Sequence, residues 1–169
     1  MAEALPPGLL EALRAIRLVI LDVDGVLTDG RFTLDNAGNE TKTFHTQDGY
    51  GIRRLIDAGI TVAIITGRRS GAVEHRAREL GISPVIQGAR DKAIAIEELL
   101  AETGIQSGQA LAVGDDIPDL AMFEAVATGV AVANAVPELK ERAHYITARS
   151  GGAGAIRELA DLIVKSRTD

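Results

Sequence analysis

The 169-residue sequence predicts an α/β fold in which a parallel β-sheet is covered by helices on both faces. Short runs of branched apolar residues recur along the chain, and segments with the apolar spacing of an amphipathic helix lie between them. The runs at 18–21, 62–65 and 110–113 are apolar throughout, as strands buried on both faces are, and Thr61 precedes the second of them. Because there is no internal repeat or linker, we expect a single domain over residues 1–169.

The first third of the chain is expected to hold a helix, a strand and a β-hairpin. A Pro-Pro-Gly segment precedes apolar residues at 9, 10, 13 and 16, which is typical of a short amphipathic helix before the strand 18–21. Turn residues at 35–39 separate two short β-prone segments, which predicts a hairpin over 31–44. The hairpin is too small to be a domain, so we interpret it as a flap or an assembly element.

From residue 49 onward, predicted helices and strands alternate. Ser70 can cap one of these helices, and Gly81 can end it after Leu80. The expected elements are a helix after Gly49 with Ile52, Leu55 and Ile56 inside, a strand at 61–65, a helix at 71–80, a strand at 84–86, a helix at 92–102 with an apolar stripe of Ile94, Ile96, Leu99 and Leu100, a strand at 110–113, a helix at 118–125, a strand at 129–132, a short helix from Pro137, a strand near 145–146 and a helix at 153–165.

Composition excludes several classes of function. The net charge of −6 and the pI near 5.1 argue against nucleic acid or an anionic membrane as a general partner. The chain has no cysteine, so it can form no disulfide, zinc thiolate or thiol nucleophile. No apolar run approaches the ~20 residues of a membrane span, and residues 1–8 lack the pattern of a signal peptide. We therefore expect a cytoplasmic protein.

Polar side chains follow four of the predicted strands at the point where each strand ends. In a parallel sheet these ends open on one edge, so residues distant in sequence can meet there. The residues are Asp22 and Asp24 after the first strand, Thr66 and Arg68 after the second, Gln87, Gly88 and Lys92 after the third, and Asp115, Asp116 and Asp119 after the fourth.

This set of residue types suits phosphoryl chemistry. Carboxylate oxygens favour Mg²⁺, threonine and lysine suit phosphoryl oxygens, and a free carboxylate can attack phosphorus. An EF-hand calcium loop starting at Asp22 is excluded, because Val26 occupies the fifth position, which needs an oxygen ligand, and Thr33 the twelfth, which needs Glu. Each residue alone also has a structural interpretation: the 115–116 acids can cap a helix, Lys92 can be a solvated helix residue, and Thr66 can be a turn residue.

The order of these motifs resembles the haloacid dehalogenase (HAD) superfamily of phosphotransferases. The motifs are Asp-Val-Asp-Gly-Val at 22–26, Ile-Ile-Thr-Gly-Arg at 64–68, Lys92, and Val-Gly-Asp-Asp at 113–116. More closely, the chain resembles the small branch without a cap domain, typified by 3-deoxy-D-manno-octulosonate (KDO) 8-phosphate phosphatase. Supporting segments are 48–52, Gln87-Gly88 before Lys92, and 151–158, and the likeness extends from about Ile16 to Ile163. It implies a Rossmann-like HAD fold.

The resemblance also implies catalytic roles. Asp22 would be the nucleophile that forms an aspartyl-phosphate, and Asp24 the general acid and then the general base. Mg²⁺ would bind the carboxylates of Asp22 and Asp115 and the backbone carbonyl of Asp24. Thr66 would hold phosphoryl oxygens, and Lys92 would balance the charge of nucleophile and phosphate. Asp116 and Asp119 would be supporting or helix-capping groups.

The family likewise suggests where the sugar acid binds. Arginine suits a substrate carboxylate, although Arg53 and Arg76 could instead be solvated helix residues and His45 a polar residue at the hairpin edge. The implied contacts are His45, Thr46, Gln47, Asp48, Gly49, Arg53, Arg68 and Arg76, together with Asp24 and Lys92.

The implied function is Mg²⁺-dependent hydrolysis of KDO 8-phosphate in the synthesis of lipopolysaccharide precursors. A phosphatase for the nine-carbon 2-keto-3-deoxynonulosonate 9-phosphate is the alternative enzyme, and a non-catalytic oligomerisation module is the alternative of another class. Proteins of this type are homotetramers whose hairpins meet at the centre, where neighbouring subunits restrict the active site. Since only about twenty residues separate Thr28 from Gly49, this chain has no room there for a cap domain.

Overall fold

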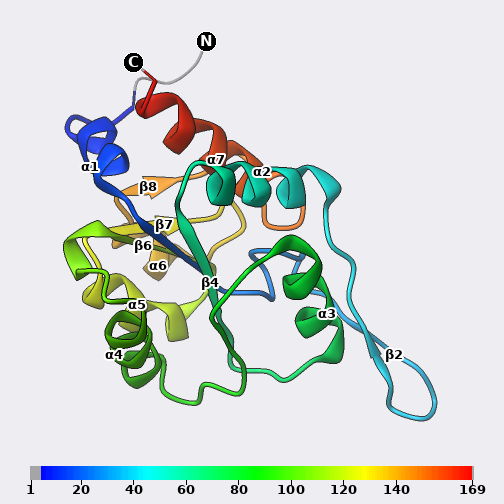
Figure 1. The fold of residues 1–169 in the computed structure, drawn as a ribbon. Coiled ribbons are helices and arrows are strands. Elements are labelled where there is room, and N and C mark those ends of the chain that lie inside the picture. Colours follow the sequence, from blue (N-terminus) through cyan, green and yellow to red (C-terminus); the bar gives the residue numbers. More distant parts are fainter. Residues whose placement is uncertain (1–4, 169) are drawn as a thin grey trace.

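The computed structural model describes residues 5–168, and a six-stranded sheet forms its centre. All strand pairs in this sheet are parallel, and the strand order is β5-β4-β1-β6-β7-β8 (Figure 1). The strands are β1 (Leu18–Leu21), β4 (Thr61–Ile65), β5 (Val85–Ile86), β6 (Ala110–Gly114), β7 (Thr128–Ala131) and β8 (Tyr145–Ile146). The predicted parallel sheet is therefore confirmed.

Helices cover both faces of this sheet, as predicted. Helices α1, α2 and α7 pack against one another on one face, and α4 and α5 pack together on the other (Figure 1). The helices are α1 (Leu9–Ala15), α2 (Thr46–Asp57), α3 (Gly71–Leu80), α4 (Lys92–Thr103), α5 (Leu120–Ala125), α6 (Pro137–Glu141) and α7 (Ala155–Ser166), with 3-10 turns at Ser107–Gln109 and Ile117–Asp119. No helix among residues 5–168 is long and apolar enough to cross a membrane.

Strand β1 is the centre of the hydrophobic core. All four of its side chains are fully buried, and Leu21 lies beside Ile64 of β4 and Val113 of β6. The chain turns from β1 toward β4 but from β6 toward β7, so the connections diverge at this point of the sheet. Such a divergence leaves a crevice at the carboxyl ends of the two strands. The sheet therefore delivers residues 22 and 115 to the same crevice.

The predicted hairpin is present and projects from the body of the molecule (Figure 1). Its strands are β2 (Thr33–Leu34) and β3 (Glu40–Thr41), paired antiparallel. The turn is closed by Asp35, whose Oδ1 accepts backbone N–H groups of Ala37 and Asn39 at 2.8 and 2.9 Å. Within the described residues the chain has no cap domain between β1 and β4, because only this hairpin and α2 lie there.

Three helix starts differ from the prediction by more than one residue. Helix α2 begins at Thr46 rather than after Gly49, because His45 caps it by accepting the N–H of Gln47 at Nδ1. Helix α7 begins at Ala155, since residues 151–154 form a glycine-rich turn. Ile117 starts a 3-10 turn before α5, where a single helix from 118 was expected.

Two side chains also differ from the prediction. Ile94 is 55% exposed, and the buried face of α4 is formed by Lys92, Ala95, Ile96 and Leu99. The prediction counted Ile94 because it is apolar, but the inner face of α4 carries positions 92, 95, 96 and 99, which leaves position 94 outside. Ser70 occupies the position before α3, but its side chain makes no capping hydrogen bond.

Candidate active site

A cleft of about 320 Å³ lies at the carboxyl edge of the sheet, where the sequence predicted a site. Asp22, Asp24, Thr66, Arg68, Lys92, Asp115, Asp116 and Asp119 are among the residues that line it. The structure thus brings together groups from the ends of β1, β4 and β6 and from the start of α4. The expected convergence is present for these groups, whereas Gln87 and Gly88, which follow β5, are not among the residues that line the cleft.

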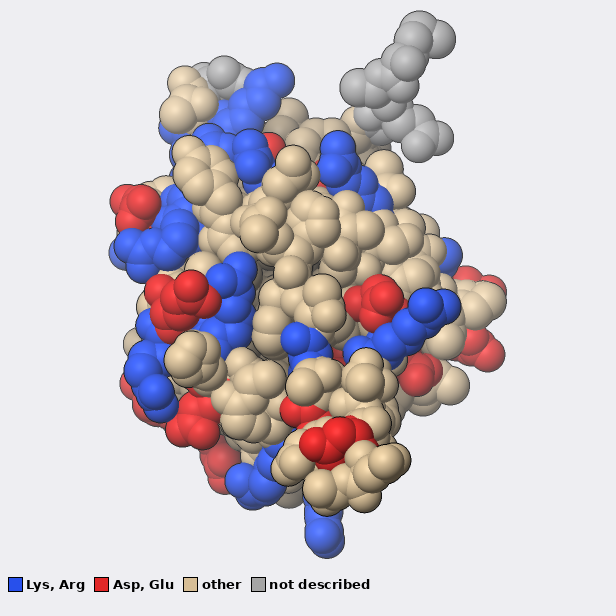
Figure 2. Space-filling view, turned by 90° about the vertical axis from the view of Figure 1, so that its right-hand side faces the viewer, with Lys and Arg blue, Asp and Glu red and all other residues tan. Residues whose placement is uncertain are grey.

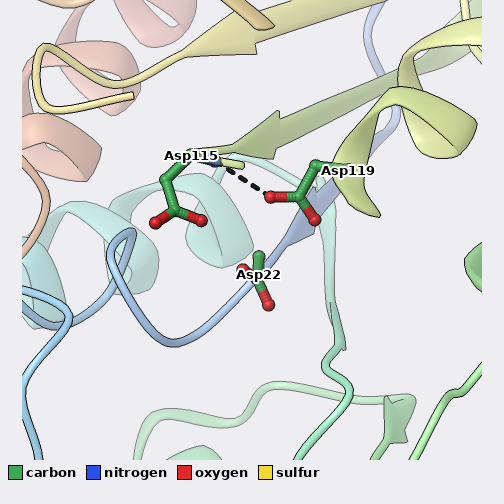
Figure 3. A group of neighbouring side chains, drawn as sticks. All are labelled: Asp22, Asp115 and Asp119. Atoms are coloured by element: carbon green, nitrogen blue, oxygen red, sulfur yellow. Dashed lines mark hydrogen bonds between the residues drawn. The ribbon is translucent and has the colours of Figure 1, made fainter. Parts of the chain in front are cut away.

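Three carboxylates in the cleft face one shared space (Figure 3). Asp22 follows β1, Asp115 follows β6, and Asp119 ends the 3-10 turn, and each offers an oxygen within 4.8 Å of the others. Asp22 and Asp119 are buried, and Asp115 is partly exposed to the cleft. Converging carboxylate oxygens are the donor set that a hard divalent cation prefers.

The charges of these carboxylates are poorly balanced within the chain. Burial and the neighbouring Asp119 raise the pKa of Asp22 to about 6, although Lys92 opposes the shift. Burial and the charge of Asp22 raise the pKa of Asp115 to about 8. Bringing positive charge between the two groups would favour their ionised forms. The two carboxylates are therefore better suited to hold a cation than to stand ionised without one.

Lys92 is the cation that the chain itself supplies. Its side chain is 7% exposed, and Nζ lies 2.5 Å from Oδ1 of Asp119 and 3.1 Å from Oδ1 of Asp22. Burial alone would lower the pKa of Lys92, but these two acids raise it above its ordinary value, so the amine stays an ammonium. A solvated surface role for Lys92 is excluded. Its place at the first residue of α4 is fixed by Asp91, which caps the helix.

Asp119 fixes the loop that carries Asp115. Its Oδ2 accepts the backbone N–H groups of Asp115 and Asp116 at 2.9 and 3.3 Å. Asp116 accepts the N–H of Ile117 at 2.8 Å, and Asp116 and Asp119 form a capping box in which each side chain accepts the backbone N–H of the other residue. Gly114 permits this arrangement, because a Cβ there would lie 2.4 Å from the Cβ of Asp119. Asp116 and Asp119 thus cap the turn, as the sequence suggested, and Asp119 also pairs with Lys92.

The loop after β1 is held from within and from the far end of the chain. Gly25 has a positive φ of 84°, and a Cβ there would lie 1.9 Å from Oδ2 of Asp115. The Thr28 hydroxyl accepts the N–H of Gly25 at 3.2 Å. Asn134 donates from Nδ2 to the Gly25 carbonyl at 3.0 Å and accepts the N–H of Gly151 at 2.7 Å. The loop that carries Asp24 is therefore fixed by Thr28 from within and by Asn134 from outside, and Asn134 is itself held by Gly151.

The sequence did not point to the group that contacts the Asp24 carboxylate. Lys42 Nζ donates to Oδ1 of Asp24 at 2.5 Å and lies 3.1 Å from Glu40. Glu40 also accepts a hydrogen bond from Arg68, which holds the pKa of Glu40 below its ordinary value. Glu40 lies in β3 and Lys42 directly follows this strand, and in extended chain a spacing of two residues places side chains on one face. That alternation was the available signal.

Most of the residues predicted to contact the sugar acid lie outside this cleft. Of these residues, Asp24, Arg68 and Lys92 line it in a single chain. Asp48 is 2% exposed and accepts the N–H groups of Gly154 and Arg157 at the start of α7. His45 caps α2, while Thr46 and Gln47 are exposed.

The two helix arginines have partners of their own. Arg53 donates to the Leu80 carbonyl at 3.0 Å, and Arg76 pairs with Glu79 at 2.7 Å and lies against Gly49. The Arg76 side chain is 22% exposed, so a solvated position is wrong for it, whereas the Arg53 side chain is 46% exposed. Their contact with substrate stays a prediction.

Comparisons with known proteins agree with this geometry. A profile of haloacid dehalogenase-like hydrolases matches residues 84–159. The chain is 50% identical over 149 residues to the 3-deoxy-D-manno-octulosonate 8-phosphate phosphatase KdsC of Yersinia pestis, covering 88% of this chain and 80% of that protein. It is 48% identical to the protein of the same name from Escherichia coli K12, covering 88% and 79%.

Solved structures match as well. A crystal structure of the phosphatase from Yersinia pestis superposes with a TM-score of 0.94 at 46% identity, covering 96% of this chain and 88% of that one. The Moraxella catarrhalis phosphatase, solved with a magnesium ion, a phosphate ion and KDO, gives a TM-score of 0.93 at 40% identity, covering 96% and 94%. The chain therefore belongs to the haloacid dehalogenase-like hydrolases, in the family of the 3-deoxy-D-manno-octulosonate 8-phosphate phosphatases.

Proposed function

We propose that this protein is a Mg²⁺-dependent phosphatase that hydrolyses KDO 8-phosphate to KDO and phosphate. The observation that carries the proposal is the cluster of Asp22, Asp115 and Lys92 beyond the end of β1. Two carboxylates with raised pKa values and one ammonium suit the binding and transfer of a phosphoryl group. Relatives about half identical to the chain carry the name of this activity.

Each residue of the cleft has a task in this reaction. One carboxylate oxygen of Asp22 forms a bond to phosphorus while the bond to the sugar oxygen breaks, and Asp24 gives a proton to the departing alkoxide. Asp24 then takes a proton from water as that water attacks the aspartyl-phosphate and releases phosphate. Thr66 and Lys92 hold phosphoryl oxygens throughout.

The metal would be bound by the carboxylates of Asp22 and Asp115 and the backbone carbonyl of Asp24. Mg²⁺ there supplies positive charge that stabilises the transferring phosphoryl group. Asp119 is a less suitable ligand than its position suggests, since both of its oxygens already accept hydrogen bonds. This leaves Asp22 and Asp115 as the two side chains with oxygen atoms to offer.

We further propose the assembly and setting of the enzyme. The whole chain acts as one hydrolase domain with the hairpin 31–44 as its flap. The hairpin exposes Phe32 and Leu34 by 40% and 57%, which supports a homotetramer that buries them and covers the open cleft. In that assembly His45–Gly49, Arg53 and Arg76 remain candidates for sugar-acid contacts. We place the reaction in the cytoplasm, in the synthesis of lipopolysaccharide precursors.

The experiment that tests the function is Mg²⁺-dependent phosphate release from the eight-carbon and nine-carbon ketoacid phosphates. Asp22→Asn serves as the blank, and we expect it to lower turnover by at least about 10³-fold because it removes the nucleophile. Preference for the eight-carbon ester supports the proposal. Preference for the nine-carbon ester keeps the mechanism and changes the substrate. If the folded protein hydrolyses neither ester with Mg²⁺ present, it is an oligomerisation module instead.

A further inference from the structure

The returning strand of the hairpin brings one lysine into the active site. Lys42 Nζ donates to Oδ1 of Asp24 at 2.5 Å, and the Lys42 side chain has no exposed surface. The hairpin itself is otherwise largely exposed, and most of it projects away from the sheet (Figure 1). A fully buried ammonium on such an element is unusual, because lysine is rarely buried without a partner. Lys42 is therefore attached to the catalytic loop rather than to the core.

Lys42 provides the hydrogen bond that orients Asp24. Among residues 5–168, no other side chain or backbone N–H donates to this carboxylate, whereas Asp119 is held by three donors and Asp48 by two. The nearest further cation is Arg68, whose Nε lies 4.0 Å from Oδ2 of Asp24, beyond hydrogen-bonding distance. One oxygen of Asp24 is thus fixed and the other is left available.

Three neighbouring side chains, Glu40, Arg68 and Phe32, keep Lys42 in place. Glu40 lies 3.1 Å from Nζ of Lys42 and is also hydrogen-bonded to Arg68. The ring of Phe32 lies beneath both cations, 5.5 Å from Nζ of Lys42 and 4.1 Å from Cζ of Arg68. The two carboxylates, Asp24 and Glu40, thus lie between the two cations, and the Phe32 ring packs against both cations. Figure 2, which views the molecule from the hairpin side, shows acidic and basic side chains interspersed on this face.

We propose that Lys42 is a positioning residue, which holds the Asp24 carboxylate in the orientation that delivers a proton to the leaving group. The inference rests on the proposed function, in which Asp24 is the general acid. A general acid works within about 2.6–3.2 Å of the atom it protonates, and misplacement by about 1 Å can cost about 10²-fold in rate. Because Lys42 belongs to the hairpin, Asp24 is oriented only while the hairpin is docked.

Leaving-group dependence separates positioning from a merely structural role. Phenyl phosphate and 4-nitrophenyl phosphate have nearly the same shape, but 4-nitrophenolate is a far more stable anion and needs little help from an acid. The parameter to compare is kcat/KM, which covers the steps through departure of the leaving group. Loss of a positioned acid should therefore lower kcat/KM for phenyl phosphate and for the sugar phosphate, but hardly for the nitrophenyl ester.

The decisive variant is Lys42→Met, which keeps an unbranched side chain only one heavy atom shorter and removes the charge. We expect kcat/KM to fall about tenfold or more for KDO 8-phosphate and phenyl phosphate, and less than about threefold for 4-nitrophenyl phosphate. Lys165→Met is the matched control, since Lys165 is exposed and distant from the cleft. Thermal unfolding of each variant checks that the fold is kept.

Chemical restoration of the ammonium provides an independent readout. A cysteine introduced at position 42 would be the sole thiol of the protein, because the chain contains no cysteine. Lys42→Cys can be alkylated with 2-bromoethylamine in denaturant and refolded, which rebuilds an ammonium of nearly the same reach at this position alone. Wild-type protein taken through the same treatment controls for refolding. We expect alkylation to restore most of the kcat/KM for phenyl phosphate that Lys42→Cys loses.

Three outcomes overturn the inference: unchanged kcat/KM for phenyl phosphate in Lys42→Met, an equal fall for both aryl esters, or failure of the rebuilt ammonium to restore activity. If wild-type protein hydrolyses no phosphate ester, the proposed function fails and this inference fails with it. If wild type is active and Lys42→Met shows no leaving-group split, the inference alone fails.

Discussion

Gly151 offers a sharp test of how the catalytic loop is fixed. A Cβ at this position would lie 1.8 Å from the carbonyl oxygen of Gly25 and 2.9 Å from that of Thr28. Both atoms belong to the backbone of the loop after Asp24, so no side chain can rotate away to relieve the clash. Gly151 does not have a positive φ, so alanine is acceptable to its own backbone. Gly151→Ala therefore perturbs the approach of the two segments and nothing else.

The size of the perturbation follows from the geometry. A Cβ is essentially never found closer than 3.0 Å to such an atom, so the segments must separate by at least 1.2 Å. Forced overpacking of this kind costs about 1–3 kcal/mol of unfolding free energy. For a chain of this length, that lowers the unfolding midpoint by about 2–12 °C. A shift of about 1 Å in Asp24 can lower the rate by about 10²-fold.

The assay is kcat/KM for the sugar phosphate with Mg²⁺, measured beside the thermal midpoint. Gly108→Ala is the matched control, because a Cβ there meets nothing within 4 Å and Gly108 lies before β6, at the opposite end of the strand from the cleft. We expect the control to keep both values. If Gly151→Ala keeps wild-type activity, whether or not its midpoint falls, then the glycine-rich turn does not control the position of Asp24.

Three other predictions follow from buried charges. Burial raises the pKa of Asp48 above its ordinary 3.8, so the folded protein binds a proton there more tightly than the unfolded chain does. The stability that this proton contributes is present at low pH and is lost as pH rises through the raised pKa. In urea unfolding, the free energy of unfolding of Asp48→Asn should therefore rise relative to that of wild type between about pH 4 and about pH 7. Mg²⁺ should raise the midpoint more at about pH 8.5 than at about pH 6, because protons compete for carboxylates with pKa values of about 6 and 8, and chelation should abolish hydrolysis. Asp119→Ala should cost about 1–3 kcal/mol in urea unfolding and lower kcat, because it leaves two N–H groups unpaired and Lys92 with one partner.

The fold and the centre of the site could be predicted from the sequence because both depend on local patterns. Runs made almost wholly of apolar residues identified β1, β4 and β6, and the parallel topology then required their carboxyl ends to meet. Asp22, Thr66 and Asp115 follow those strands directly, so few degrees of freedom separate their sequence positions from their places in the cleft. The same reasoning placed Lys92, at the start of a helix that returns to the same edge.

The contacts that the sequence did not predict depend on long-range packing. Asp48 was predicted as a contact for the sugar acid, but α7 packs on α2, and the Asp48 carboxylate accepts backbone N–H groups at the start of α7, more than a hundred residues away. The start of α2 was placed too late because histidine at 45 is a weak capping signal. The spacing of Glu40 and Lys42, at and just after the short strand β3, predicts that the two side chains share a face. It does not predict which part of the protein that face contacts.

These long-range contacts converge on one short segment. The loop from Asp22 to Gly30 is approached by the hairpin, through Lys42 on Asp24, and by the glycine-rich turn, through Gly151 on Gly25. The hairpin (31–44) and the glycine-rich turn (151–154) both lie outside this loop in the sequence. The local sequence of the loop therefore does not determine either contact. The position of the general acid is therefore a property of the assembled fold. Lys42→Met and Gly151→Ala act on the same carboxylate through different segments, so their effects on kcat/KM should be less than additive when combined.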